Sequence, residues 1–212
     1  MQLVIEHLPA QGRPEQLLVL LHGWAQPGRA MAGLASALQA AFAQALDRIP
    51  HAAAAAAIGR CRRFGNQHRG LRDSPDTWPA RVADQLGPMQ AWLQAQQQRL
   101  GVAPAATCLA GFSQGAVLSL ELVTRHDGIA GRVLAFGGRF VQPPALPPRQ
   151  TTLHFLHGDA DDIFPAAELQ QAFDHLARQQ GDATLDIAHG VGHELHPALI
   201  VRSANYRDIG KP

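Results

Sequence analysis

The chain has 212 residues, 46% of them hydrophobic, which is enough to build one domain with a sizeable core over residues 1–212. Its formal net charge is +1, so the sequence predicts neither a nucleic-acid partner nor attraction to an anionic membrane. Two cysteines are too few for a disulfide framework, and no apolar run is long enough to span a membrane, which excludes integral membrane association.

The first residues predict a strand. Residues 1–6 have the pattern of an edge strand and lack the basic start and long apolar core of a signal peptide, so we expect a cytoplasmic location. The apolar run 17–21 predicts a buried strand, and it leads into His22-Gly23-Trp24. Residues 31–44 then have a helical pattern.

The segment from residue 45 to residue 72 is atypical. Asp47 and Arg48 would interrupt a buried strand, and the six alanines at 52–57 favour a helix over pairing in a sheet. We expect a short or distorted strand at 46–49 and then a flexible loop. A pair of compensating reading-frame changes is the alternative explanation, and translating the other two frames across codons 45–72 would test it.

From residue 80 onward, strand and helix patterns alternate. Strands are expected at 107–110, 132–136, 151–156 and 183–188, and helices at 80–100, 116–126, 166–180 and 194–209. This alternation predicts an α/β fold with a mostly parallel central sheet and helices on both faces. No long insertion precedes Asp161, so no lid domain is expected.

A serine occupies the turn between the strand 107–110 and the helix that starts at Ala116. It is the centre of Gly111-Phe112-Ser113-Gln114-Gly115, a Gly-x-Ser-x-Gly sequence of the kind that forms a nucleophile elbow. The serine of such a turn adopts a strained backbone conformation that exposes its hydroxyl group. A Cβ atom at Gly111 or Gly115 would collide with the neighbouring strand and helix. Ser113 is therefore the candidate nucleophile.

A serine nucleophile of this kind needs an acid and a histidine that follow it in the order Ser, Asp, His. Acidic residues, Asp159, Asp161 and Asp162, follow the strand 151–156, and His193 follows the strand 183–188. Because the carboxyl ends of parallel strands lie at one edge of a sheet, we expect these groups and Ser113 to meet there.

Four motifs together resemble the carboxylesterase/phospholipase branch of the α/β hydrolases, which includes acyl-protein thioesterases and small bacterial esterases. They are Leu21-His22-Gly23-Trp24, Gly111-Phe112-Ser113-Gln114-Gly115-Ala116, His157-Gly158-x-x-Asp161 and Gly192-His193-Glu194. The resemblance covers most of residues 15–200. It implies the α/β-hydrolase fold and a Ser-His-Asp catalytic triad.

The resemblance also implies individual roles. Ser113 would be the nucleophile, His193 the general base and then acid, and Asp161 the group that orients the histidine. The family places its acid four residues after the histidine of the His-Gly pair, which selects Asp161; Asp159 and Asp162 are then interpreted as solvated loop acids. The backbone N–H groups of Trp24 and Gln114 would form the oxyanion hole.

Other residues near the motifs have less specific interpretations. Phe64, Ile163 and Phe164 are candidates for binding substrate, with ordinary packing as the alternative. His22 and His157 are interpreted as structural loop histidines. His196 follows His193 by three residues, but no third ligand cluster accompanies them, so neither a metal nor a cofactor is expected.

The sequence therefore predicts a serine hydrolase that cleaves small-molecule carboxylic esters with small or medium acyl groups through an acyl-enzyme. A thioesterase or a lysophospholipase with the same triad is an open alternative, because selectivity depends on the shape of the pocket. A catalytically impaired relative that acts as a binding protein is another, in view of residues 45–72. Oligomeric state and acyl chain length are not indicated.

Overall fold

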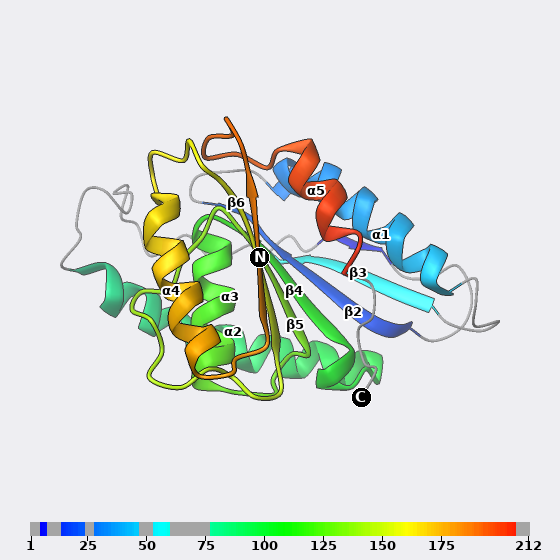
Figure 1. Cartoon of the computed structure of the whole chain (residues 1–212). Coiled ribbons are helices and arrows are strands. Elements are labelled where there is room, and N and C mark those ends of the chain that lie inside the picture. Colours follow the sequence, from blue (N-terminus) through cyan, green and yellow to red (C-terminus); the bar gives the residue numbers. More distant parts are fainter. Residues whose placement is uncertain (1–4, 8–13, 24–27, 47–52, 60–76, 207–212) are drawn as a thin grey trace.

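One sheet of seven strands organises the part of the chain that the computed structural model describes, which is residues 5–7, 14–23, 28–46, 53–59 and 77–206 (Figure 1). The strand order is β1-β3-β2-β4-β5-β6-β7, in which β1 runs antiparallel to β3 and all other neighbours are parallel. The strands are β1 (Ile5–His7), β2 (Pro14–Leu21), β3 (Ala53–Gly59), β4 (Thr107–Phe112), β5 (Arg132–Phe136), β6 (Thr152–Gly158) and β7 (Ala183–Ala188).

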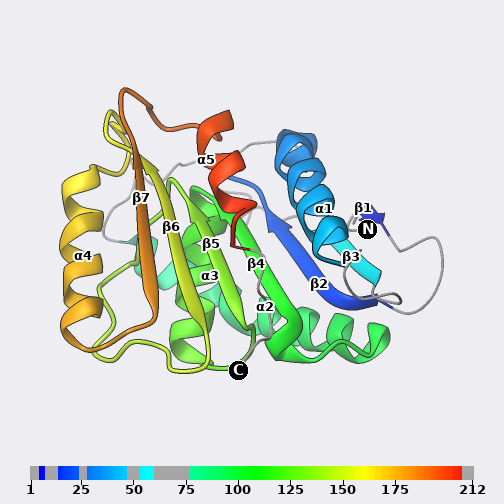
Figure 2. The ribbon, with the colours of Figure 1, turned by 45° about the vertical axis from the view of Figure 1, so that its right-hand side comes forward.

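Helices cover both faces of this sheet, as Figure 2 shows. Helices α1 and α5 lie on one face, and α2, α3 and α4 lie on the other. Their bounds are α1 (Ala32–Leu46), α2 (Trp78–Leu100), α3 (Gln114–Arg125), α4 (Ala166–Arg178) and α5 (Pro197–Ser203). The expected mostly parallel sheet with helices on both faces is therefore confirmed.

The central strands are buried on both faces because helices pack against each. On β2, Leu17 and Val19 belong to the core beneath α2, α3 and α4, whereas Leu18 and Leu20 belong to the core beneath α1 and α5. Every residue of β4 and β5 is buried. This is why these strands read as continuous apolar runs in the sequence and not as an alternating pattern.

The prediction for the alanine run was wrong. Ala53–Gly59 forms strand β3, which pairs with β1 on one side and with β2 on the other, instead of extending a helix. Leu46, expected to begin a strand, is the last residue of α1, and residues 47–49 lie outside the described part. Pairing with β2 along the whole strand, and with β1 over residues 56–58, gives the backbone of β3 hydrogen-bond partners, and this long-range term outweighs the low intrinsic strand preference of alanine.

The closing helix is shorter than the predicted range 194–209. Helix α5 spans Pro197–Ser203, and the His196 side chain accepts a hydrogen bond of 3.2 Å from the Ala198 N–H at its start. Proline is favoured at the first helical position because it lacks an N–H group to satisfy. After α5 the chain turns back, so that the Tyr206 carbonyl accepts a hydrogen bond from Arg132.

Beneath this turn lies His154, a buried residue of β6 that faces α5. The Tyr206 ring stacks on it with 3.8 Å between ring centroids, and its Nδ1 atom is 2.8 Å from the Thr184 hydroxyl oxygen. Burial, and after it the positive charge of Arg132, lowers the pKa of His154 from 6.5 to about 3, although Asp182 acts in the opposite direction. His154 is therefore neutral in the folded protein at neutral pH.

Exchanging His154 for glutamine is expected to make the protein less sensitive to acid unfolding. Between pH 6.5 and about 3 the unfolded chain binds the proton that folded His154 excludes. The contribution of His154 to the free energy of unfolding is therefore fully present above pH 6.5. It decreases by about 1.4 kcal/mol for each pH unit below that value, down to about pH 3. Urea titrations of both proteins across this range measure the effect. The prediction would be wrong if the free energy of unfolding of the wild type, minus that of the variant, did not decrease as pH falls.

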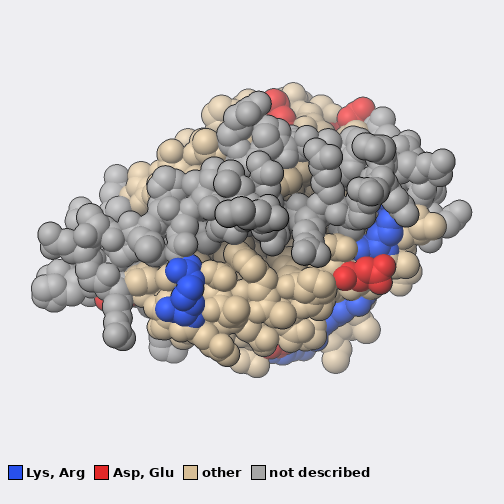
Figure 3. Space-filling view, turned by 180° about the vertical axis from the view of Figure 1, so that it is seen from behind, with Lys and Arg blue, Asp and Glu red and all other residues tan. Residues whose placement is uncertain are grey.

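The face of the molecule opposite to that of Figure 1 carries charges of both signs. Figure 3 shows arginine side chains and acidic side chains among uncharged residues on this face. Among the helices of the described ranges, none combines the length and the apolar character that crossing a bilayer requires.

Candidate active site

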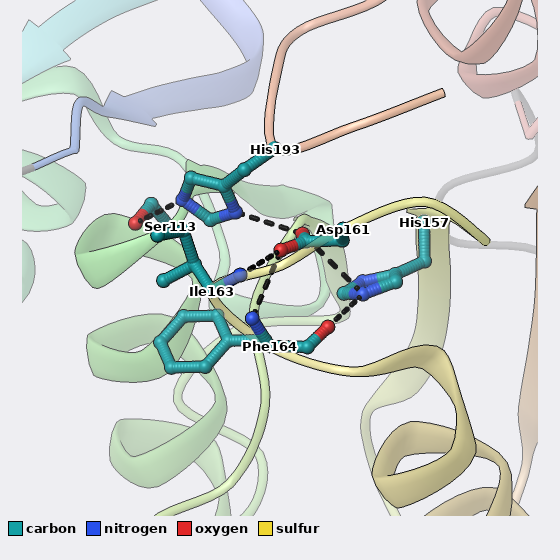
Figure 4. A network of polar contacts seen from close by, with 6 residues as sticks. All are labelled: Ser113, His157, Asp161, Ile163, Phe164 and His193. Atoms are coloured by element: carbon teal, nitrogen blue, oxygen red, sulfur yellow. Dashed lines mark hydrogen bonds and ion pairs between the residues drawn. The ribbon is translucent and has the colours of Figure 1, made fainter. Parts of the chain in front are cut away.

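Ser113 lies at the turn from β4 into α3 and has a strained backbone, with φ 53° and ψ −117°. A positive φ is uncommon for a residue that carries a Cβ atom. The turn is held because the Ser113 N–H donates to the Phe136 carbonyl at 2.9 Å, while the Ser113 carbonyl accepts from the Val117 N–H at 3.0 Å. Figure 4 shows the Ser113 hydroxyl group directed at His193.

Both glycines of the turn are required by close backbone approach, as the sequence predicted. A Cβ atom at Gly115 would overlap the carbonyl group of Leu21 on β2. A Cβ atom at Gly111 would overlap the backbone of Gly115 and Ala116. The turn can therefore fit between β2 and α3 only with glycine at these two positions.

Three side chains from three different loops form one chain of hydrogen bonds. His193 Nε2 is 2.9 Å from Ser113 Oγ, and His193 Nδ1 is 2.7 Å from Asp161 Oδ2. Figure 4 shows His193 between the other two residues. The structure thus brings together the three residues that the sequence proposed as a triad, each after the carboxyl end of a parallel strand, at the edge where sites of such sheets lie.

The environment of Asp161 keeps its carboxyl group ionised. Burial raises the pKa of Asp161, but hydrogen bonds from His193, Phe164 and Ile163 outweigh burial and hold this pKa below its usual value. Its Oδ1 accepts from the N–H groups of Ile163 at 2.8 Å and Phe164 at 2.9 Å. Because a carboxylate only accepts, His193 Nδ1 carries the proton, which leaves Nε2 free to accept from the Ser113 hydroxyl group.

The loop that carries Asp161 and the loop that carries His193 are joined by Asp159, which was expected to be a solvated acid. Asp159 is exposed, but its carboxylate is 2.6 Å from His189 Nδ1 and accepts from the Gly190 N–H at 2.7 Å. Hydrogen bonds, first from His189 and then from Gly190, lower the pKa of Asp159. Asp162 is exposed as predicted.

Gly158 allows the same two loops to approach closely. A Cβ atom at Gly158 would overlap the carbonyl group of Val191, whose oxygen accepts a hydrogen bond of 3.0 Å from the Ala160 N–H. The glycine of the His-Gly pair therefore has a steric role that the sequence motif alone does not reveal.

Aromatic rings enclose the imidazole of His193. The Phe112 ring lies 5.0 Å from it, and the Phe164 ring meets it edge-on at 5.7 Å. The side chain of His193 remains 16% exposed, whereas that of Asp161 is fully buried. The imidazole is therefore more accessible than the carboxylate that it contacts.

Of the three residues proposed to bind substrate, two lie in the described part. Ile163 is partly buried and Phe164 is buried, and both hold Asp161 through their N–H groups. Phe64 lies outside the described residues, as does Trp24, the proposed second oxyanion donor. The first proposed donor, the Gln114 N–H, is at the N-terminus of α3, where the leading N–H groups have no partner within the helix.

Arg139 and Trp78 flank this site and were missed by the sequence analysis. The Arg139 guanidinium lies 5.1 Å from the centre of the Trp78 ring and 5.5 Å from that of Phe164, and its Nη1 is 2.8 Å from Glu168 Oε2. A cation between two rings is held by cation–π attraction. Its place in the sequence could have indicated Arg139, because it follows β5 just as the triad residues follow β4, β6 and β7.

Glu121 of α3 forms a hydrogen bond with the loop after β5. It is 7% exposed, and its Oε1 accepts a hydrogen bond of 2.7 Å from the Val141 N–H. Burial raises the pKa of Glu121, although this hydrogen bond and the charge of Arg125 oppose the effect. This buried acid therefore supports the loop that carries Arg139 without touching the triad.

The remaining histidines do not form a metal site within the described residues, where no group of three or more His, Cys, Asp or Glu side chains is placed to hold an ion. His196 caps α5. His22 Nδ1 is 2.7 Å from the Gly23 carbonyl oxygen, so this residue stabilises the end of β2 locally.

Known proteins resemble this chain in sequence and in fold. The chain matches the phospholipase/carboxylesterase family over residues 5–205. Esterase YpfH of Escherichia coli (strain K12) is 31% identical over 188 residues, which cover 85% of this chain and 77% of YpfH.

Solved structures show the same fold. Esterase PE8 has a TM-score of 0.74 at 24% identity, covering 99% of each chain. The carboxylesterase of Bacillus cereus has a TM-score of 0.75 at 14% identity, covering 98% of this chain and 94% of the other. With the family match over nearly the whole sequence, the chain belongs to the phospholipase/carboxylesterase family of α/β hydrolases.

Proposed function

We propose that the protein hydrolyses carboxylic esters of small molecules through an acyl-enzyme on Ser113. The observation that carries this proposal is the hydrogen-bonded chain from Ser113 Oγ through His193 to Asp161, with distances of 2.9 and 2.7 Å. A free serine hydroxyl group is a weak nucleophile, and a histidine base within hydrogen-bond distance activates it.

In the first half of the reaction, Ser113 attacks the ester carbonyl carbon while His193 Nε2 takes the hydroxyl proton. Asp161 stabilises the imidazolium that forms and keeps it in the required orientation. The C–O bond to the alcohol then breaks, and His193 returns its proton to the leaving alcohol. Ser113 is left as an ester of the acyl group.

In the second half, a water molecule attacks the acyl carbon while His193 again takes a proton. The bond to Ser113 Oγ breaks, and the serine recovers its proton from His193. The developing oxyanion in both halves needs donors, for which we propose the backbone N–H groups of Gln114 and Trp24. Loss of one such donor costs on the order of 3 kcal/mol in other hydrolases.

The ester class is supported by the relatives, because YpfH and PE8 are both named esterases. We propose small or medium acyl groups, since the connection between β5 and β6, the segment in which a lid would be inserted, is only residues 137–151. A thioester or a lysophospholipid would be attacked by the same serine, so the test compares leaving groups directly.

Mixing the protein with p-nitrophenyl acetate should release a burst of p-nitrophenol equal to the enzyme concentration, followed by slower turnover. Mass spectrometry of an acid-quenched sample should find one acetyl group, on the peptide that contains Ser113. Butyrate and octanoate esters, matched acyl thioesters and a lysophospholipid then rank the substrates by kcat/KM. A folded protein with no burst and no acyl adduct on any of these would refute the proposal.

A further inference from the structure

His157 lies immediately behind the carboxylate of the proposed triad. It is completely buried near the end of β6, four residues before Asp161. Its Nε2 is 2.7 Å from the Phe164 carbonyl oxygen and 3.4 Å from Asp161 Oδ2. Its Nδ1 is buried without a hydrogen-bond partner among the residues that the structure describes. Figure 4 shows His157 beyond Asp161 on the side away from His193.

The proton on the His157 ring is directed at the backbone and not at the acid. A carbonyl oxygen can only accept, so Nε2 must be the donor in the 2.7 Å contact with Phe164. The 3.4 Å distance to Asp161 Oδ2 is much longer than the 2.7 Å that separates this oxygen from His193 Nδ1. His193 is thus the principal partner of this carboxylate oxygen.

His157 also stays uncharged. Burial lowers the pKa of His157, and the neighbouring His193 acts in the same direction, whereas the Phe164 carbonyl and Asp161 oppose them. A neutral ring leaves the charge of Asp161 available to His193. It also adds no repulsion when His193 takes up a proton.

We infer that His157 is a positioning residue that places Asp161 for catalysis by closing the loop that carries Asp161. Its bond to the Phe164 carbonyl fixes the residue whose own N–H donates to Asp161 Oδ1. The Ile163 N–H donates to the same oxygen, so the carboxylate is held by the loop that His157 closes. This inference rests on the proposed function, because the group that is positioned is the acid of the proposed triad.

The expected signature is a kinetic change without loss of binding. Replacing His157 with leucine removes the donor while keeping apolar bulk, and a shift of Asp161 by about 1 Å would lower kcat on the order of 10²-fold. KM should stay nearly constant, because His157 is buried and faces no substrate. His157→Gln, which can keep an N–H donor near Nε2, should recover much of kcat.

His154 supplies a matched control. It lies on the same strand, is also buried and has a lowered pKa, but it faces α5 and contacts Thr184 and Tyr206. His154→Gln should therefore leave kcat and KM unchanged. A fall in kcat for His157→Leu that is matched by His154→Gln, or a loss confined to KM, would overturn the inference.

A measurement that needs no turnover separates this inference from the proposed function. The proton between His193 Nδ1 and Asp161 should give a low-field proton NMR signal that is lost in His157→Leu and retained in His157→Gln and His154→Gln. The same signal in all variants would overturn the positioning role. A signal that depends on His157 in a protein that hydrolyses no ester would support the positioning role and refute the proposed function.

Discussion

Replacing Ser113 with alanine is expected to lower kcat for p-nitrophenyl butyrate by about 10⁶-fold, with little change in KM. Removal of the nucleophile of a serine triad costs this much because the base and the acid act only through it. The fold should survive, since alanine lacks only the Oγ atom, whose described hydrogen bond is the one to His193. Steady-state kinetics on both purified proteins, with thermal unfolding as a check of folding, measures the effect.

Ser119 offers a matched control for this experiment. It lies on α3, is fully buried, and its Oγ donates only to the Gly115 carbonyl at 2.8 Å in the described structure. Ser119→Ala should therefore lose stability on the order of 1 kcal/mol, the scale of one hydrogen bond, and keep its kcat. Turnover by Ser113→Ala within tenfold of the wild type would show that another group is the nucleophile.

Exchanging Asp161 for asparagine is expected to lower kcat by about 10⁴-fold without unfolding the loop. The amide oxygen can still accept from the N–H groups of Ile163 and Phe164, which now hold Asp161 Oδ1 at 2.8 and 2.9 Å. The amide nitrogen, however, donates to His193 Nδ1 and selects the tautomer with the proton on Nε2. That tautomer cannot take the proton of Ser113.

The wrong tautomer, unlike a changed ionisation, is not corrected by pH. The loss in Asp161→Asn should therefore persist across the neutral and mildly alkaline range in kcat measurements. Asp162→Asn is the natural comparison, because Asp162 is the next residue and is exposed. Near-normal activity of Asp161→Asn, or an equal loss in Asp162→Asn, would remove Asp161 from the proposed mechanism.

The loop after β5 packs beside the proposed site through Arg139. Arg139 lies between the rings of Trp78 and Phe164, and Phe164 in turn meets His193 edge-on. These contacts connect the start of α2, the loop after β5 and the loop after β6. The acid loop is thus packed against elements that are distant in the sequence, which explains how a surface loop can hold a buried carboxylate.

Local features of the sequence determined much of this protein. The spacing of Gly111, Ser113 and Gly115 predicted a strained turn, because steric exclusion of Cβ atoms and a positive φ act within a few residues. The apolar runs predicted the central strands, because a strand that is buried on both faces has a continuous apolar sequence that can be recognised without knowledge of its neighbours. The order of Ser113, Asp161 and His193 predicted their meeting, since parallel strands end at one edge.

Tertiary structure alone decided the rest, because these contacts depend on how strands and loops are arranged in space. The alanines of β3 form a strand because β1 and β2 pair with its backbone, against the helical preference of alanine. Asp159 joins two loops, and Arg139 meets the rings of Trp78 and Phe164, only when separate strands bring the partners together. The direction of the His157 proton, set by a carbonyl group seven residues away, likewise depends on how the loop closes.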